Sequence, residues 1–213
     1  MIFYGRKILF VGAHPDDIEI GCGAFLANIS GSAEVLCATV SDNQKNPELR
    51  NLVAEHYRSM RILGVPEDKV VVKDFETRNF PRDRQKILEF LYDLGRSFNP
   101  DIVFVHSQSD IHQDHTVVTT EALRAFRGTS VLGFDVLRSS YGFFPHFLVE
   151  VTENDAQLKL EALAEYETYK SKYYFSPQII RSTLIRHGAL AERPFAEGFD
   201  ILRIVGNYKS AGN

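Results

Sequence analysis

The sequence predicts an α/β protein with a doubly wound, mostly parallel sheet and helices on both of its faces. Strand-like and helix-like patterns alternate through the first two-thirds of the 213 residues. Two strand-like runs, 8–11 and 101–106, are almost entirely apolar, as expected of strands that are buried on both faces. Polar clusters follow both runs directly. They would therefore meet at the carboxyl edge of the sheet, where open α/β sheets bind ligands.

Hydrophobic periodicity and turn residues assign the elements in the first half of the chain. Pro47 suits the first turn of a helix, Gly64 ends that helix, and Asn99-Pro100 breaks the next one. A loop over 75–81 precedes this later helix. The predicted strands are 8–11, 33–40 and 69–72, and the predicted helices are 18–29, 49–63 and 82–98.

The second half continues the alternation and then becomes less regular. The strand at 101–106 leads into a polar loop and then a helix, for which Asp114 is a plausible N-cap. No internal repeat or long linker divides the chain, so residues 1–213 are expected to form one domain. Further strands are predicted at 131–137, 147–151 and 199–205, and further helices at 114–126, at 155–169 and from Ser176 onward.

Composition excludes several classes of protein. The chain is 44% hydrophobic and 24% charged, with a net charge of −4, and its basic residues are scattered. These values are typical of a soluble domain and do not indicate a nucleic-acid partner. Cys22 and Cys37 lie in apolar segments, which predicts buried free thiols in a reducing compartment. No signal peptide or membrane-spanning run is recognisable, so a cytoplasmic location is expected.

Two polar clusters contain the residue types of a metal site. His14-Pro-Asp-Asp follows the first strand, and Pro15 cannot donate to a sheet ladder, so strand pairing should stop at His14. The segment 106–115 holds three of the seven histidines and two aspartates. A single cluster of this kind is more simply interpreted as a polar loop capping a helix. Two clusters at the ends of parallel strands favour a shared site.

The chemistry of zinc assigns a role to most of these side chains. Catalytic zinc takes three His, Asp or Glu ligands and leaves one position for water. His14, Asp17 and His115 would supply them. Asp16 would remain free to act as general base. His112, one helical turn from His115, would donate to a developing oxyanion. Fe²⁺ and other divalent metals suit the same ligands.

The motifs resemble those of a known family. His14-Pro-Asp-Asp with the following Ile-Glu-Ile-Gly-Cys-Gly looks like the first motif of the PIG-L (LmbE-like) zinc-dependent N-acetylglucosaminyl deacetylases, and 110–115 resembles their second. The resemblance spans about the whole chain. It implies a Rossmann-like fold and removal of an acetyl group from an N-acetylated sugar. Further similar segments are 63–65, 99–103, 159–163 and 195–199.

The resemblance also implies roles by position. The implied zinc ligands are His14, Asp17 and His115, the implied base is Asp16, and the implied oxyanion stabiliser or acid is His112. Asp114 would orient a histidine, unless it only caps its helix. Arg50 lies near a position where the family usually has an arginine, and Asp110 stands where some members have a tyrosine. These two residues are candidate substrate contacts.

We therefore expect a zinc-dependent hydrolase that acts on a small N-acetylated sugar or sugar conjugate. Two alternatives stay open, namely a hydrolase of another amide such as a thiol conjugate, and a non-catalytic member that binds metal or sugar. The unligated Asp16 argues against a purely structural metal site. No dinucleotide cofactor is expected, because Gly21-x-Gly23 lacks the third glycine of that fingerprint. The chain could also form a homo-oligomer.

Overall fold

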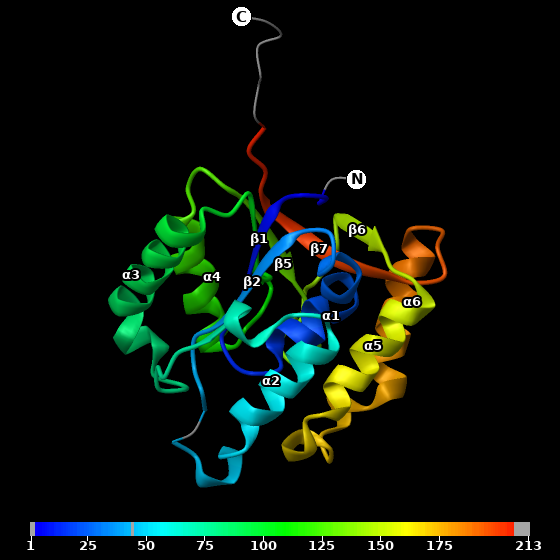
Figure 1. Ribbon diagram of the computed structural model, residues 1–213, viewed down its shortest axis with the longest axis horizontal. Coiled ribbons are helices and arrows are strands. Elements are labelled where there is room, and N and C mark those ends of the chain that lie inside the picture. The colour runs from blue at the N-terminus through cyan, green and yellow to red at the C-terminus, as the bar shows by residue number, and fades with distance from the viewer. Residues whose placement is uncertain (1–2, 44, 207–213) are drawn as a thin grey trace, which may run out of the picture.

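The fold is known from a computed structural model that describes residues 3–43 and 45–206. Its seven-stranded sheet has the order β3-β2-β1-β4-β5-β7-β6 (Figure 1). The first five strands are parallel, and β7 runs antiparallel to both of its neighbours. The mostly parallel sheet is thereby confirmed. The strands are β1 (Lys7–Gly12), β2 (Glu34–Thr39), β3 (Val70–Val72), β4 (Ile102–His106), β5 (Ser130–Phe134), β6 (Phe147–Glu150) and β7 (Ala196–Arg203).

Helices cover both faces of this sheet, as predicted. The helices α3 and α4 pack on one face, and α1, α2, α5 and α6 pack on the other (Figure 1). Each face therefore has its own apolar core. The helices are α1 (Asp17–Ile29), α2 (Leu52–Ile62), α3 (Phe80–Phe98), α4 (Gln113–Ala125), α5 (Glu153–Ala164) and α6 (Pro177–Leu190).

The central strand β1 contributes to both cores because successive side chains of a strand point to opposite faces. Ile8 and Phe10 belong to the core under α1, α2, α5 and α6. Leu9 and Val11 belong to the core under α3 and α4. All four side chains are fully buried. This arrangement explains why the run is continuously apolar, and it fixes the end of β1 in the middle of the sheet.

Three predicted boundaries are wrong for local reasons. The helix predicted over 49–63 is a 3₁₀ turn, Pro47–Leu49, followed by α2, because the Asn46 side chain accepts from Glu48 N and caps a separate short turn. The helix predicted to end at 169 stops at Ala164, and Tyr166 takes a non-helical conformation from which its hydroxyl donates to Glu19. The last strand begins at Ala196, because it pairs with β6 from there.

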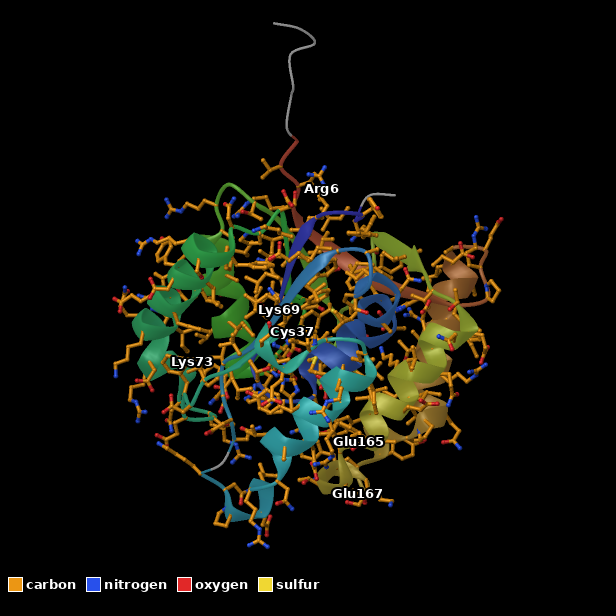
Figure 2. The ribbon with its side chains drawn as sticks, viewed as in Figure 1. Arg6, Cys37, Lys69, Lys73, Glu165 and Glu167 are labelled. Carbon is orange, nitrogen blue, oxygen red and sulfur yellow. The ribbon has the colours of Figure 1, made fainter. Side chains whose placement is uncertain are left out.

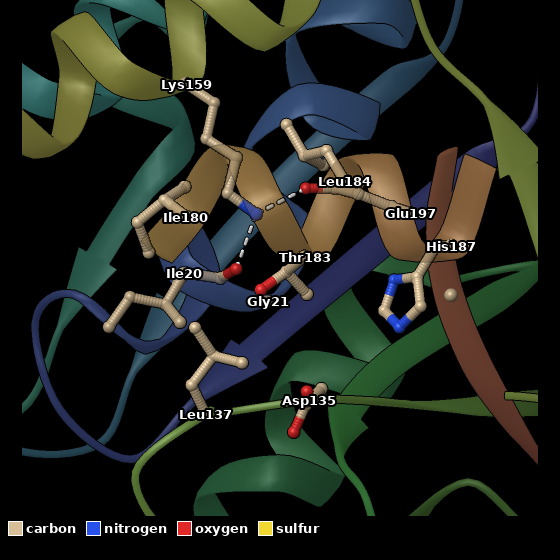
Figure 3. Close-up of a pocket in the computed structure, with 11 residues that line it drawn as sticks. Ile20, Gly21, Asp135, Leu137, Lys159, Ile180, Thr183, Leu184, His187 and Glu197 are labelled. Atoms are coloured by element: carbon tan, nitrogen blue, oxygen red, sulfur yellow. Dashed lines mark hydrogen bonds and ion pairs between the residues drawn. The ribbon is translucent and has the colours of Figure 1, made fainter. Parts of the chain in front are cut away.

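A buried ion pair ties the later elements to α1. Lys159 Nζ of α5 donates to Glu197 Oε1 of β7 over 2.6 Å and to the carbonyl of Ile20 over 2.5 Å (Figure 3). Glu197 also accepts from the backbone amides of Ala24 and Phe25, at 3.1 and 2.7 Å. Charges buried this deeply require such hydrogen bonds to offset their lost hydration. The pair therefore fixes α1, and with it the loop that precedes α1.

Both cysteines are buried free thiols, as predicted. Cys37 lies on β2 inside the molecule, whereas Glu165 and Glu167 lie at its periphery (Figure 2). Burial raises the pKa values of the Cys22 and Cys37 thiols well above the usual value for a cysteine. These thiols are therefore core residues with little thiolate character.

Candidate metal centre

The candidate site lies where β1 and β4 end side by side. The strand order 3-2-1-4-5 reverses direction between these two strands, and such a switch point leaves a crevice at the carboxyl edge. The chain after β1 turns sharply, because Asp16 has a left-handed φ of 105°. Such a conformation in a residue other than glycine costs about 1–3 kcal/mol and is found mostly at functional sites. It allows α1 to begin directly at Asp17.

The three predicted metal ligands converge. His14 Nδ1 lies 3.3 Å from His115 Nε2 and 3.5 Å from Asp17 Oδ2. His115 Nε2 lies 3.4 Å from Asp17 Oδ1. Ligands placed about 2.0–2.2 Å from a tetrahedral zinc ion are roughly 3.3–3.6 Å from one another. Each pair of these residues therefore has a spacing that suits a tetrahedral metal, with Oδ2 of Asp17 nearest His14 and Oδ1 nearest His115.

Each of the two histidines has a carboxylate on its other ring nitrogen. His14 Nε2 donates to Asp114 Oδ2 over 3.1 Å, and His115 Nδ1 donates to Asp110 Oδ2 over 2.8 Å. Both carboxylates are buried. Carboxylates in this position fix the tautomer and the ring orientation of metal-binding histidines. The hydrogen bonds leave His14 Nδ1 and His115 Nε2, the two converging atoms, free to coordinate.

The ionisation of these groups reflects their closeness. Burial lowers the pKa of His14, but the hydrogen bonds to Asp114 and Asp17 outweigh this effect and raise it to about 9. Burial raises the pKa of Asp17, but the neighbouring histidines, His115 foremost, outweigh this effect and leave that pKa far below its usual value. Without a metal, positive imidazole charge is thus balanced by the carboxylates that surround it.

The N-cap of α4 is His112 and not Asp114. His112 Nδ1 accepts from Asp114 N over 3.2 Å, so the helix starts at Gln113, one residue before the predicted start. Asp114 instead places its carboxylate on His14 and on the backbone amide of Arg78. Of the two alternatives for Asp114, capping the helix is therefore wrong. A neutral His112 that accepts at Nδ1 carries its proton on Nε2.

Asp16 is the carboxylate that is not engaged. It is 7% exposed and lines a cavity of about 470 Å³ together with His14, His112 and His115. Among the described residues, its side chain accepts no hydrogen bond and does not cap α1. Burial and the charge of Asp17 raise the pKa of Asp16 well above its ordinary value. Its carboxylate is thus a stronger proton acceptor than an exposed aspartate.

His106 lies behind the site. Its ring stacks on His115 with centroids 3.9 Å apart, and its Nε2 accepts from Ala13 N over 3.0 Å. Burial and the charge of His115 lower the pKa of His106 to about 3, so the ring is neutral. His106 therefore links the end of β1 to the ring of His115. His106, His115 and Asp17 also form one group whose nitrogen and oxygen atoms lie within 4.8 Å of one another, and His14, His112 and His115 form another.

The structure separates two predicted substrate contacts from the cavity. Arg50 is exposed and is absent from the cavity wall, to which its neighbours Glu48 and Leu49 belong. Asp110 also lies outside the wall, because its carboxylate is bonded behind His115. Neither residue belongs to the cavity wall, although Arg50 directly follows Leu49, which does.

Sequence reasoning missed the residues that complete the wall. Arg138 comes from the loop after β5, and Tyr169, Lys172 and Tyr174 come from the 3₁₀ turns after α5. A signal for Arg138 was present, because it follows a predicted apolar strand at the same edge as the two metal motifs. No comparable pattern marks the two tyrosines. Within the described ranges, 3–43 and 45–206, we find no helix that is long and apolar enough to cross a membrane.

Comparison with known proteins gives relatives and structural neighbours. The chain is 28% identical over 171 residues to "Uncharacterized deacetylase YaiS" of Escherichia coli (strain K12), covering 76% of this chain and 91% of that protein. An N,N'-diacetylchitobiose deacetylase from Pyrococcus horikoshii superposes with a TM-score of 0.78 at 20% identity, over 92% of this chain and 84% of that one.

A second solved structure shows that the fold alone does not fix the reaction. GalB, the 4-carboxy-2-hydroxymuconate hydratase from Pseudomonas putida KT2440, superposes with a TM-score of 0.72 at 16% identity. That superposition covers 96% of this chain and all of the other. The sequence model of the PIG-L family, described as GlcNAc-PI de-N-acetylase, matches residues 9–126, which is more than half of the chain and includes both metal motifs. The protein therefore belongs to the PIG-L family.

Proposed function

We propose that this protein is a zinc-dependent N-deacetylase that releases acetate from a small N-acetylated sugar or sugar conjugate. The observation that carries the proposal is the spacing of His14, Asp17 and His115, which suits a metal, beside the unengaged carboxylate of Asp16. The E. coli relative is named a deacetylase, and the family description and the Pyrococcus enzyme name acetylated amino sugars. These names support the choice of reaction and of substrate class.

The proposed reaction is hydrolysis of the acetamide. A divalent metal held by His14, Asp17 and His115 would act as a Lewis acid and lower the pKa of a water molecule in the site. Asp16 accepts a proton from the attacking water, whose oxygen forms a bond to the carbonyl carbon. His112 donates a hydrogen bond from its Nε2–H to the carbonyl oxygen as negative charge develops there. The proton from Asp16 then passes to the nitrogen, the carbon–nitrogen bond breaks, and acetate and a free amine leave.

Three further residues position this machinery. Asp114 and Asp110 hold the outer nitrogens of His14 and His115, so they set which nitrogens face the metal. His106 supports the His115 ring by stacking on it. Variants of these three residues should change metal affinity and catalytic geometry together.

Zinc is our choice of metal because two imidazoles and one carboxylate at tetrahedral spacing are typical of catalytic zinc. The same ligands accept Fe²⁺. Metal analysis of protein that is purified without added metal, followed by reconstitution with each ion, identifies the native metal.

The competing substrate class is another amide, such as a thiol conjugate.

The central experiment separates metal binding from turnover. Asp16→Asn should keep bound zinc and lose roughly 10²- to 10⁴-fold in the rate of acetate release, the usual contribution of a general base. His14→Ala should lose both. Asp68→Asn, which alters an exposed carboxylate at the amino edge of the sheet, should change neither. An Asp16→Asn variant that releases acetate as fast as the unmodified protein would overturn the mechanism.

The substrate class is tested in the same assay. Acetate release is measured over a panel of N-acetylated sugars and over mercapturate-type amides. Faster release from the sugars supports the proposal, and release from the thiol conjugates alone favours the competing amidase. A protein that binds zinc stoichiometrically and hydrolyses neither class would be a non-catalytic member of the family.

A further inference from the structure

Three basic side chains line the cavity of the metal centre, and each comes from a different loop. Arg78 precedes α3, Arg138 follows β5, and Lys172 follows α5. Within the described part of the chain, none of the three forms an ion pair with a carboxylate. Most other arginines of the surface do, for example Arg58 with Glu165 and Arg193 with Glu150. The cavity thus gathers uncompensated positive charge in a protein whose net charge is −4.

Two of these cations lie on the same side of the cavity. The Arg138 guanidinium lies over the ring of Tyr174, 5.6 Å from its centroid. Lys172 is the residue directly before the short turn that contains Tyr174. Stacking on an aromatic ring holds a guanidinium in place and leaves its N–H groups free to bind. Arg138 and Lys172 therefore both line the cavity wall close to the turn that contains Tyr174.

The charge balance of the cavity favours a negatively charged ligand. Its wall contains three carboxylates, from Asp16, Asp17 and Glu48, against the three basic side chains. The two charges of a divalent cation at the metal centre would be offset by the buried carboxylates of Asp110 and Asp114, so the unpaired charges of Arg138 and Lys172 would remain. A neutral sugar gains little from such a field, whereas an anion is attracted and oriented by it.

We propose that the substrate carries a phosphate or carboxylate group beside its acetamido sugar, and that Arg138 and Lys172 bind this group. The inference rests on the proposed deacetylation and adds a specificity determinant to it. Arginine binds the oxygens of either group through two parallel hydrogen bonds, and lysine adds a point charge. Tyr174, beside them, offers a flat surface for the sugar ring. The sequence analysis did not single out Arg138 or Lys172, and its candidate arginine was Arg50.

The test compares matched substrates on the zinc-loaded protein. The neutral compound is N-acetylglucosamine, and the anionic ones are its 1-phosphate, its 6-phosphate and N-acetylmuramic acid, which carries a carboxylate. We expect kcat/KM to be at least about tenfold higher for one of the anionic compounds. Arg138→Gln should lower that preference by roughly ten- to hundredfold, mainly through KM, which is the usual worth of a hydrogen-bonded charge pair. Lys172→Gln should have a smaller effect in the same direction.

Arg127→Gln is the matched control. Arg127 is exposed and follows α4 at the amino edge of the sheet, away from the cavity. Its loss removes the same charge without touching the proposed subsite, so the preference should persist. A preference that falls equally in Arg127→Gln and Arg138→Gln would show only a general effect of net charge and would overturn the assignment.

A second measurement does not depend on turnover. Inorganic phosphate is titrated into the zinc-loaded protein by calorimetry, and binding is expected to weaken in Arg138→Gln and in high salt. The inference is overturned if N-acetylglucosamine is hydrolysed as well as every anionic compound, or if the Arg138 and Lys172 variants keep the preference. It is also overturned if phosphate binding is absent or unchanged in Arg138→Gln. Release of acetate from no compound would instead contradict the proposed function, and phosphate binding would still test this subsite.

Discussion

Asp110 fixes His115 through a hydrogen bond of 2.8 Å from His115 Nδ1 to Asp110 Oδ2. The same oxygen accepts from Ser139 Oγ over 2.9 Å, and Asp110 Oδ1 accepts from the His112 backbone amide over 2.8 Å. One carboxylate thus joins the loop after β4 to the loop after β5. The orientation of His115 is therefore set by the surrounding fold before any metal binds.

This relationship predicts that Asp110→Asn lowers metal affinity without removing a ligand. The amide is a weaker acceptor than the carboxylate and leaves the His115 ring less firmly oriented. We expect zinc affinity to fall about 10- to 100-fold. Competition with a chromophoric chelator measures the change, and Asp68→Asn, at the amino edge of the sheet, serves as the control. Equal zinc affinities in Asp110→Asn and the unmodified protein would contradict the role of Asp110.

The buried pair of Lys159 and Glu197 should contribute strongly to stability. Lys159→Met leaves the Glu197 carboxylate buried without its counter-charge, which costs about 3–5 kcal/mol in comparable cases. Urea unfolding measures the loss. Arg193→Met, which breaks the exposed pair with Glu150, should cost under about 1 kcal/mol. Similar losses in the two variants would mean that the buried pair has no special role in holding α1.

His187 should make stability fall in mild acid. Burial and the charges of Lys159 and Arg186 lower its pKa to about 4, against an ordinary value of 6.5. Between pH 6.5 and 4, His187 is therefore protonated in the unfolded chain but neutral in the folded chain. Its contribution to the free energy of unfolding is complete above pH 6.5 and is lost as the pH falls towards 4. His187 lines a second, small cavity together with Asp135, Lys159 and Glu197 (Figure 3).

The test is to compare His187→Leu with the unmodified protein, because the other titrating groups are common to both. Between pH 7.5 and pH 5.0 the unmodified protein should lose about 2 kcal/mol more free energy of unfolding than the variant. Urea titrations at the two pH values measure this difference. Parallel loss in the two proteins would show that His187 titrates normally.

The fold was predictable because its signals are local and consistent. Successive residues of β1 point to opposite faces of the sheet, and those from Ile8 to Val11 are all apolar. Such a strand must be covered on both faces. Boundaries were less predictable where a side chain competes with the helix. His112 caps α4 with a ring nitrogen, and Tyr166 leaves α5 to reach Glu19, and neither event has a sequence pattern. Such tertiary contacts decide the last turn of a helix.

The candidate site was predictable to the extent that it lies in two short motifs. His14, Asp17 and His115 follow adjacent strands, and the rule for the sheet edge brings such residues together. Of the carboxylates behind the histidines, Asp114 was expected either to orient a histidine or to cap its helix, and Asp110 was expected to contact substrate. The choice depends on ring orientation, which the sequence does not encode. Arg138 and Tyr174 come from separate late loops that meet only after the chain folds. Their pairing is a property of packing, which spacing along the chain does not encode.

Gly21 is predicted to be required by close packing of α1 against β5. An alanine Cβ at this position would lie 2.3 Å from Cδ2 of Phe134, whose ring is fully buried. Alanine in a helix is ordinarily about 1 kcal/mol more favourable than glycine, but overlap in a packed core reverses the sign. We expect Gly21→Ala to lower the free energy of unfolding by about 1–3 kcal/mol in urea titrations. Gly128→Ala, where a Cβ would meet no atom within 4 Å, should change it by less than about 0.5 kcal/mol. A Gly21→Ala variant at least as stable as the unmodified protein would show that α1 can move away from the sheet at this point and that close packing does not require glycine there.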